Sequence, residues 1–201
     1  MTDVQQTYEK IANWMDKNRS RTLFEKPWLD KVINCLKPQA KILDLGCGTG
    51  VPIGKYFKEN NFGVTGVDSS SEMLKLARKH DPSGRFINSD MREISLNEKF
   101  DAIIAWHSFF HLSQDEQRKM FIIFARHLND NGILIFTSGE EDGEVWGENG
   151  GQMLYHASLS QGEYKSLLKK HGFHLLEYKI MDPECGDASI WLAEYKKSQL
   201  G

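Results

Sequence analysis

The sequence has few of the features that mark secreted, membrane-spanning or metal-binding proteins. Its 201 residues include only three cysteines, Cys35, Cys47 and Cys185, whose odd number and scattered spacing fit neither a disulfide framework nor a zinc motif. No HExxH segment and no cluster of Cys and His is present, so we expect no metal site. No apolar run reaches the roughly 18 residues that a membrane span needs, and residues 1–10 lack a signal-peptide pattern. These absences predict a cytoplasmic protein with no membrane or metal partner.

An excess of positive charge is also missing. Lysine and arginine total 25 against 28 aspartate and glutamate, which gives a net charge of -3 at pH 7. Broad nucleic-acid surfaces are usually basic, so we expect no nucleic-acid partner. The 40% hydrophobic and 26% charged composition is that of an ordinary globular protein. We therefore expect residues 1–201 to form a single domain, as a monomer or homodimer.

Short apolar segments alternate with amphipathic ones along most of the chain. Apolar segments predict strands over residues 41–45, 62–67, 85–88, 100–106, 133–137, 173–180 and 188–195. Between them, three predicted helices begin with the capping-box spacing, at Ser69/Glu72, Ser113/Glu116 and Ser160/Glu163, and a fourth is predicted over residues 51–60. This alternation predicts a mainly parallel sheet that helices cover on both faces, with the last two strands as an antiparallel pair.

Two segments depart from the alternation. Residues 1–37 carry apolar residues at helical spacing, which predicts two amphipathic helices that cap a core at residues 38–201. Residues 138–151 contain five glycines and five acidic residues, so we predict a long loop there. Its acidic side chains either contact a cationic substrate or face solvent. We expect this loop and the N-terminal helices to cover the binding site.

A glycine-rich turn, Asp44-Leu45-Gly46-Cys47-Gly48-Thr49-Gly50, follows the first predicted strand. Glycines let a ligand approach the backbone where a side chain would collide, and the amides of the following helix add a positive pole. Asp68 stands 22 positions after Gly46, at the end of the second predicted strand, where an acidic residue is expected to bind ribose hydroxyls. Together these features predict an adenosine-containing ligand at the carboxyl ends of the strands.

The spacing of the glycines favours S-adenosylmethionine over a dinucleotide. The third glycine of the dinucleotide pattern GxGxxG would fall at position 51, which is Val51. S-adenosylmethionine has no pyrophosphate and carries an ammonium and a sulfonium, so the carboxylate of Asp44 suits it and would repel a phosphate. The alternative for Asp44 is that it caps the turn. For the whole protein, the alternatives are an NAD-type oxidoreductase on a similar sheet and a protein that binds S-adenosylmethionine without catalysis.

The segments DLGCGTG, GVDSS and FDAIIAWHSFFHL resemble the class I S-adenosylmethionine-dependent methyltransferases, and more narrowly small bacterial members of the methyltransferase-11/25 type. The segment around Tyr8 and Trp14 and residues 154–160 extend the resemblance over nearly the whole chain. It implies a Rossmann-like, doubly wound α/β fold with a seven-stranded mixed sheet, six strands parallel and one antiparallel, and an N-terminal helical cap. It also implies an enzyme that transfers a methyl group from S-adenosylmethionine.

The resemblance implies roles for residues at the methionine end of the cofactor. Gly46 and Gly48 would line it, with Cys47 between them as a small packing residue. Asp44 and the backbone carbonyl of Trp106 would hold the ammonium. The indole of Trp106 is also a candidate for a cation–π contact with the sulfonium, or else a packing residue.

At the nucleoside end, the resemblance places Asp68 on the ribose with Ser69 beside it. Asp90, after the third predicted strand, would accept a hydrogen bond from the adenine amino group, and Met91 would pack on the ring. Met73, in the apolar stripe of the following helix, completes the residues expected at the cofactor.

The methyl acceptor must be held in line, about 3 Å from the methyl carbon, and a hydroxyl or protonated amine needs a base. His107 and His111 follow the fourth predicted strand, and His156 lies in the later loop, so we predict these three as catalytic residues, His107 first. A structural or binding role is the alternative for each. Tyr8 and Trp14 either contact the sulfonium or pack in the core.

The acceptor class is indicated mainly by what is missing. The sequence contains no Asp/Asn-Pro-Pro-Tyr/Phe segment and no Pro-Cys pair, so neither amino methylation of DNA adenine nor cytosine-C5 methylation is expected. The segments that would cover the site are compact, which favours a small-molecule acceptor. A macromolecular acceptor is the alternative.

Overall fold

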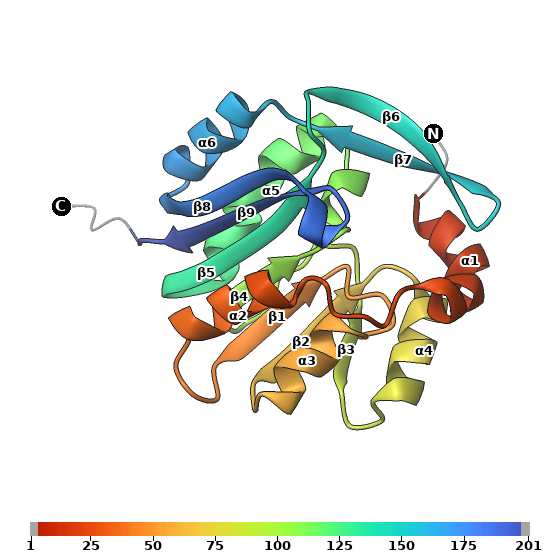
Figure 1. The fold of residues 1–201 in the computed structure, drawn as a ribbon. Helices are drawn as coiled ribbons and strands as arrows, with labels where there is room; N and C mark the ends of the chain where they lie inside the picture. The colour runs from red at the N-terminus through yellow and green to blue at the C-terminus, as the bar shows by residue number, and fades with distance from the viewer. Residues whose placement is uncertain (1–3, 198–201) are drawn as a thin grey trace.

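A seven-stranded sheet with helices on both faces forms the centre of the computed structural model, which describes residues 4–197 (Figure 1). The strands run in the order β3-β2-β1-β4-β5-β9-β8. Their bounds are β1 Lys41–Leu45, β2 Gly63–Asp68, β3 Arg85–Asn88, β4 Phe100–Ala105, β5 Leu128–Ser138, β8 Phe173–Asp182 and β9 Ala188–Tyr195. Only β9 runs antiparallel to its neighbours in this sheet within residues 4–197. The predicted mixed sheet of six parallel strands and one antiparallel strand is confirmed.

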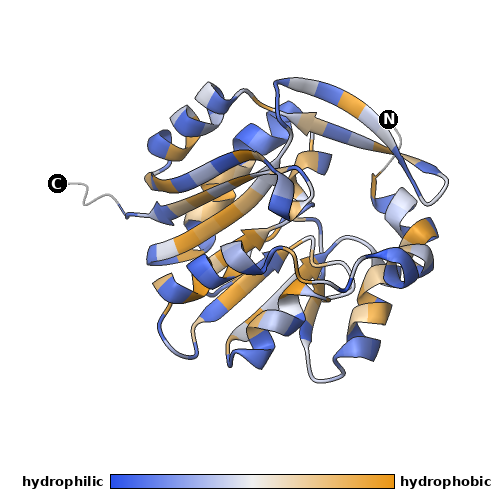
Figure 2. Cartoon of the chain, in the orientation of Figure 1, coloured by the Kyte–Doolittle hydropathy of each residue, from blue (hydrophilic) through white to orange (hydrophobic). Residues whose placement is uncertain are grey.

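Helices bury both faces of this sheet. They are α2 Lys26–Cys35, α3 Ile53–Glu59, α4 Ser71–His80, α5 Gln114–His127 and α6 Gln161–Lys170, whereas α1 Val4–Asn18 packs against α4. Trp28 of α2 and Phe57 of α3 pack with Ile42 on one face, whereas Phe121 of α5 and Tyr164 of α6 pack on the other. Because both faces are buried, the central strands are apolar along their length, as Figure 2 shows. Across residues 4–197 we find no helix with the length and apolar composition to cross a bilayer.

The order of the strands reverses between β1 and β4. From β1 the chain moves outward through β2 to β3, then returns to the other side of β1 as β4. Loops that follow adjacent strands diverge at such a point and leave a crevice at the carboxyl ends of the strands. The glycine-rich turn after β1 and residues 106–112 after β4 therefore flank one opening.

The prediction of a long loop over residues 138–151 is wrong for about half of that range. Residues Gly143–Asn149 form β6, which pairs antiparallel with β7, Gln152–Ser158. His156 therefore lies on a strand and not in a loop. The hairpin projects from the sheet and lies beside α1, which contacts both β7 and α4 (Figure 1). Together, α1 and the hairpin cover the opening, whereas α2 packs on the sheet beside α3.

Two of the three predicted helix starts are confirmed, and one is wrong by a residue. Ser113 forms the full capping box with Glu116, and the Ser160 side chain accepts from the backbone N–H of Glu163. At α4 the N-cap is Ser70 and not Ser69. Asp68 accepts a hydrogen bond from the Ser70 backbone N–H at 2.8 Å, which holds the chain in a turn there and delays the start of the helix.

Candidate active site

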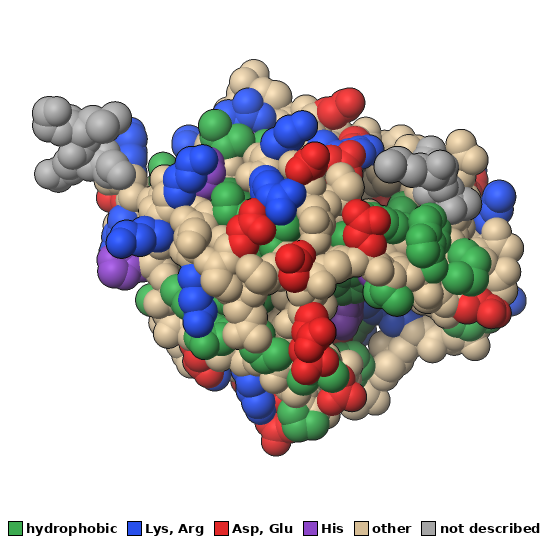
Figure 3. Space-filling model, turned by 90° about the horizontal axis from the view of Figure 1, so that it is seen from above, with side chains coloured by type: hydrophobic (Ala, Val, Ile, Leu, Met, Phe, Trp, Pro, Cys, Tyr) green, Lys and Arg blue, Asp and Glu red, His purple; other side chains and the backbone are tan. Residues whose placement is uncertain are grey.

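A cavity of about 810 Å³ lies at the carboxyl ends of β1, β2 and β4, between the glycine-rich turn, α1 and the β6–β7 hairpin. Seen from above, the molecule is hollowed there, with a histidine inside the hollow and acidic side chains beside it (Figure 3). Most of the residues predicted from the sequence line this one cavity: Tyr8, Trp14, Gly46, Gly48, Asp68, Ser69, Met73, Asp90, Met91, His107, His111 and His156.

The glycine-rich turn forms one wall in a conformation that only glycine adopts readily. Gly46 and Gly48 have φ of 73° and 54°. A Cβ on Gly46 would lie 2.2 Å from the Cβ of Ser108, whose hydroxyl donates to the Leu45 carbonyl at 2.6 Å. By contrast, nothing lies within 4 Å of where a Cβ on Gly48 would stand, so Gly48 leaves open space at the cavity wall. The backbone of the turn is thus accessible to a ligand.

Asp68 is held rigidly at the end of β2. One carboxylate oxygen accepts from the Gly48 backbone N–H and the other from that of Ser70, both at 2.8 Å. Burial raises the pKa of Asp68 above its ordinary value, and these two hydrogen bonds oppose the rise. Each oxygen keeps a further lone pair, so the carboxylate can still accept from two vicinal hydroxyls.

Three predicted cofactor residues do not line the cavity. The Asp44 carboxylate, which is only 5% exposed, lies beside Gly54 of α3, and burial raises its pKa to about 7. The thiol of Cys47 packs against Gly66 and Phe86, behind the turn. The indole of Trp106 is buried in the α2 side of the core, where its Nε1 has no hydrogen-bond partner among residues 4–197. Any contact of these residues with a cofactor stays a prediction.

At the nucleoside end, Asp90 lines the cavity but is engaged by Arg92. The Arg92 Nε lies 2.9 Å from each Asp90 carboxylate oxygen, and the Arg92 backbone N–H donates to one of them at 2.8 Å. Burial raises the pKa of Asp90, but the Arg92 hydrogen bonds outweigh it and leave the pKa below its ordinary value. Arg92 also pairs with Glu116. The lowered pKa keeps the Asp90 carboxylate ionised. Its contact with adenine stays a prediction.

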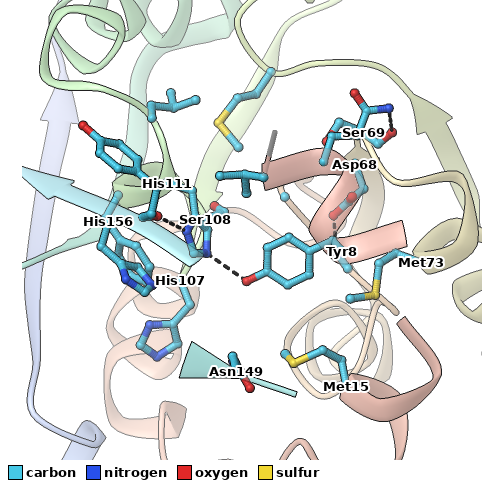
Figure 4. A pocket seen from close by; sticks show the side chains of 18 of the residues that line it. Tyr8, Met15, Asp68, Ser69, Met73, His107, Ser108, His111, Asn149 and His156 are labelled. Carbon is cyan, nitrogen blue, oxygen red and sulfur yellow. Dashed lines mark hydrogen bonds between the residues drawn. The ribbon is translucent and has the colours of Figure 1, made fainter. Parts of the chain in front are cut away.

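On the opposite wall, Tyr8 of α1 and His111 form a hydrogen-bonded pair, with Oη and Nε2 2.8 Å apart (Figure 4). The His111 Nδ1 lies 2.9 Å from the Tyr155 carbonyl oxygen, which can only accept, so Nδ1 carries the proton. Nε2 is then unprotonated, and the Tyr8 hydroxyl donates to it. Burial lowers the pKa of His111 to about 4, so this arrangement holds at neutral pH.

His107 and His156 complete a cluster of imidazoles around this pair. The His156 ring lies 4.8 Å from that of His111, between centroids, and the His107 ring lies 5.7 Å from that of Phe110. Burial lowers the pKa of His107 to about 4 and also lowers that of His156. Figure 4 shows Tyr8 between Asp68 on one side and the three histidines on the other. Over residues 4–197, no three His, Cys, Asp or Glu side chains are grouped as metal ligands.

Comparison with known proteins shows that the chain is similar to methyltransferases. Residues 42–132 match a family model described as a methyltransferase domain. A Bacillus subtilis (strain 168) protein named as a methyltransferase, YqeM, is 34% identical over 135 residues, which cover 64% of this chain and 54% of that protein. The ubiquinone/menaquinone biosynthesis C-methyltransferase UbiE of Campylobacter jejuni strain 81116 is 27% identical over 221 residues, with 94% and 92% coverage. The structure of an amino pentose methyltransferase from Micromonospora echinaspora, with S-adenosylmethionine bound, superposes with a TM-score of 0.73 at 20% identity, covering 95% and 97% of the chains.

The matched segment, the relatives and the fold together support a class I S-adenosylmethionine-dependent methyltransferase. The matched segment contains the glycine-rich turn, Asp68, Asp90 and the two histidines after β4. It leaves out α1, the hairpin and β8–β9. The chain spans about half the length of the first curated relative that it matches.

Sequence reasoning missed several charged residues in the cavity wall, among them Arg19 and Glu25. These two stand between α1 and α2, in a segment with no motif and no periodicity. Among the hairpin residues, the sequence also did not single out Trp146 and Tyr155, which line the cavity with their rings 5.3 Å apart. The only sequence signal was the predicted proximity of the N-terminal segment and the later loop to the site.

Proposed function

We propose that this chain transfers a methyl group from S-adenosylmethionine to a small-molecule acceptor bound between the glycine-rich turn and the histidines. One observation carries the proposal. A single cavity has an adenosine-type wall, made by the turn and Asp68, opposite a wall of neutral proton acceptors, Tyr8 with His111. A site that only binds the cofactor has no need of the second wall.

The residues present fit S-adenosylmethionine. Gly48 leaves backbone open to a ligand, and the fixed carboxylate of Asp68 suits ribose hydroxyls. The cavity is lined by five carboxylates and two arginines, and this excess of negative charge disfavours a pyrophosphate. The solved amino pentose methyltransferase binds this cofactor on the same fold. When bound, S-adenosylmethionine supplies a methyl group on a positively charged sulfur, which is an excellent leaving group.

The chain's own residues hold the acceptor and take its proton. A hydroxyl or protonated amine that hydrogen-bonds to the Tyr8 oxygen can pass its proton to that oxygen while the Tyr8 proton moves to Nε2 of His111. The Tyr155 carbonyl keeps hold of Nδ1–H and stabilises the imidazolium that forms. Burial keeps His111 unprotonated at pH 7 but also weakens it as a base, and the hydrogen bond to the Tyr155 carbonyl opposes that weakening.

The acceptor end of the cavity favours an aromatic or apolar body without negative charge. Phe110, Trp146 and Tyr155 supply ring surfaces, and Glu144 is the charged group at this end. The relatives are consistent with a small acceptor, since one is named for quinone biosynthesis and a structural neighbour for an amino pentose. The cytoplasmic location and the monomeric or homodimeric state expected from the sequence stay predictions.

The proposal is tested by the release of S-adenosylhomocysteine across a panel of small phenols, amines and amino sugars. With the best acceptor, we expect Tyr8→Phe and His111→Asn to lower turnover by roughly 100-fold, with the Kd of S-adenosylhomocysteine nearly unchanged. Tyr56→Phe is the matched control, because Tyr56 donates to Asp30 outside the cavity. Bound S-adenosylmethionine with no turnover on any acceptor would favour the non-catalytic alternative, and full activity of both cavity variants would exclude the proton path.

A further inference from the structure

Arg19 and Glu25 form an ion pair in the wall of the cavity, on the segment that joins α1 to α2. The Arg19 Nη2 lies 3.9 Å from the Glu25 Oε1. The Glu25 side chain is 2% exposed and that of Arg19 is 29% exposed, so the carboxylate lies deep and the guanidinium nearer to open space. Both residues line the cavity. The proposed proton path makes no use of either.

Glu25 lacks partners that a buried carboxylate needs. Its second oxygen, Oε2, is buried and accepts no hydrogen bond from any residue in the range 4–197. The contact of Oε1 with Arg19 is longer than a hydrogen bond. Burial accordingly raises the pKa of Glu25. A buried charge is costly unless it is paired and hydrogen-bonded, so this carboxylate is suited to a cation that a ligand brings.

The position of Arg19 connects the pair to the glycine-rich turn. Its positive charge opposes the burial-driven rise in the pKa of Asp44, beneath the turn, and adds to the lowering of the pKa of His107. Arg19 lines the same cavity as the turn after β1 and the histidine that follows β4. The nucleoside is expected at Asp90, in the loop that follows β3.

We propose that Arg19 and Glu25 bind the amino-acid end of S-adenosylmethionine, with Arg19 on its carboxylate and Glu25 on its ammonium. This inference rests on the proposed function. A neighbouring cation and anion match the two opposite charges of a zwitterion, and guanidinium and carboxylate have complementary hydrogen-bonding geometry. Glu25 takes the ammonium in place of Asp44, whose carboxylate lies beside Gly54 and does not line the cavity.

Binding calorimetry with three nucleosides tests the assignment without catalysis. The probes are S-adenosylhomocysteine, its decarboxylated analogue, which keeps the amine, and 5′-methylthioadenosine, which has neither group. We expect Glu25→Gln to weaken S-adenosylhomocysteine and the decarboxylated analogue by about 10- to 100-fold. We expect Arg19→Met to weaken only S-adenosylhomocysteine to that degree. Binding of 5′-methylthioadenosine should change less than about twofold in both variants, which also shows that they are folded.

The matched control is Glu177→Gln, which removes an exposed ion pair with Lys31 and should change none of the three affinities. If both cavity variants keep the wild-type preference for S-adenosylhomocysteine over 5′-methylthioadenosine, the inference is wrong although the proposed function stands. If the wild type binds none of the three nucleosides, the proposed function fails with it. Weakening of 5′-methylthioadenosine as strongly as S-adenosylhomocysteine would also overturn the assignment, because the effect would not arise at the amino-acid end.

Discussion

Gly46 allows two loops to approach each other at the mouth of the sheet. A side chain there would meet Ser108 at 2.2 Å and would also stand at φ of 73°. We expect Gly46→Ala to lower the free energy of unfolding by about 2 to 4 kcal/mol and to abolish binding of S-adenosylhomocysteine. Urea unfolding and calorimetry measure the two effects.

Gly151 is the matched control, since it has φ of 74° but nothing lies within 4 Å of where its Cβ would stand. Gly151→Ala should cost only the backbone strain, about 1 kcal/mol. Equal losses of stability in the two variants would show that contact with Ser108 does not require glycine at position 46.

We expect Asp44, which lies beneath the glycine-rich turn, to make the binding of S-adenosylmethionine depend on pH. Burial raises its pKa to about 7, so the carboxyl is largely neutral at pH 6 and largely ionised at pH 7.5. The sulfonium and ammonium of S-adenosylmethionine favour the ionised form, and we expect the affinity for S-adenosylmethionine to rise roughly fivefold over this interval. Isothermal calorimetry at both pH values should show a smaller rise for Asp44→Asn.

The raised pKa of Asp44 also makes the free energy of unfolding depend on pH. Because the folded-state pKa lies above the unfolded value, the folded protein binds more protons between pH 4 and pH 7. The wild type should therefore gain stability relative to Asp44→Asn as the pH falls through this range. A constant difference in unfolding free energy would contradict the raised pKa.

The residues of the site were predictable only where a local pattern carries them. The glycines and Asp68 stand in short motifs next to strands, so their chemistry could be read from neighbouring residues. The partnership of Tyr8 with His111 joins residues 103 positions apart and depends on how α1 lies on the core. Arg19 and Glu25 belong to no periodic segment, and the missing partner of Glu25 is visible only once burial is known.

At the scale of elements, polar contacts with α4 help to hold α1 over the cavity. The Glu9 carboxylate accepts from the backbone N–H groups of Ser71 at 2.7 Å and Glu72 at 3.0 Å, in the first turn of α4. This acts as an N-cap supplied by another helix, and such caps stabilise by about 1 kcal/mol. Loss of the contact should free α1, which carries Tyr8, from the core.

We expect Glu9→Ala to increase hydrogen exchange over residues 4–18 and to raise the Kd of S-adenosylhomocysteine about threefold to tenfold. Lys10→Ala, an exposed change on the same helix, should leave both unchanged. Unaltered exchange in the Glu9 variant would mean that other contacts hold α1 in place.

The central strands were predictable because they are buried, whereas the hairpin was not. β1 and β9 have the predicted bounds, since apolar runs bounded by turn residues are typical of strands buried on both faces. β3 also has the predicted bounds, although it is a partly exposed strand at the edge of the sheet. β6 is largely exposed and is rich in glycine and glutamate, which are uncommon in strands. It is a strand because β7 pairs with it, and β7 is anchored where Gln117 donates to the Ala157 carbonyl at 2.9 Å.

At the scale of the whole molecule, the residues expected at the cofactor lie at one edge of the sheet, and α1 and the β6–β7 hairpin cover them. The reversal of strand order brings the turn after β1 and the histidines after β4 to one opening. The α/β alternation alone predicted this opening. Its cover, made by α1 and the hairpin, determines what can enter, and its shape follows from long-range packing that no local pattern encodes.

The central claim is that this cavity binds S-adenosylmethionine and not a dinucleotide. Thermal unfolding with S-adenosylhomocysteine, and separately with NAD, tests it most directly. At a hundredfold excess over Kd, S-adenosylhomocysteine should stabilise the fold by about 2.7 kcal/mol, which raises Tm by roughly 5 to 10 °C. NAD should produce no shift, and stabilisation by NAD without stabilisation by S-adenosylhomocysteine would contradict the account.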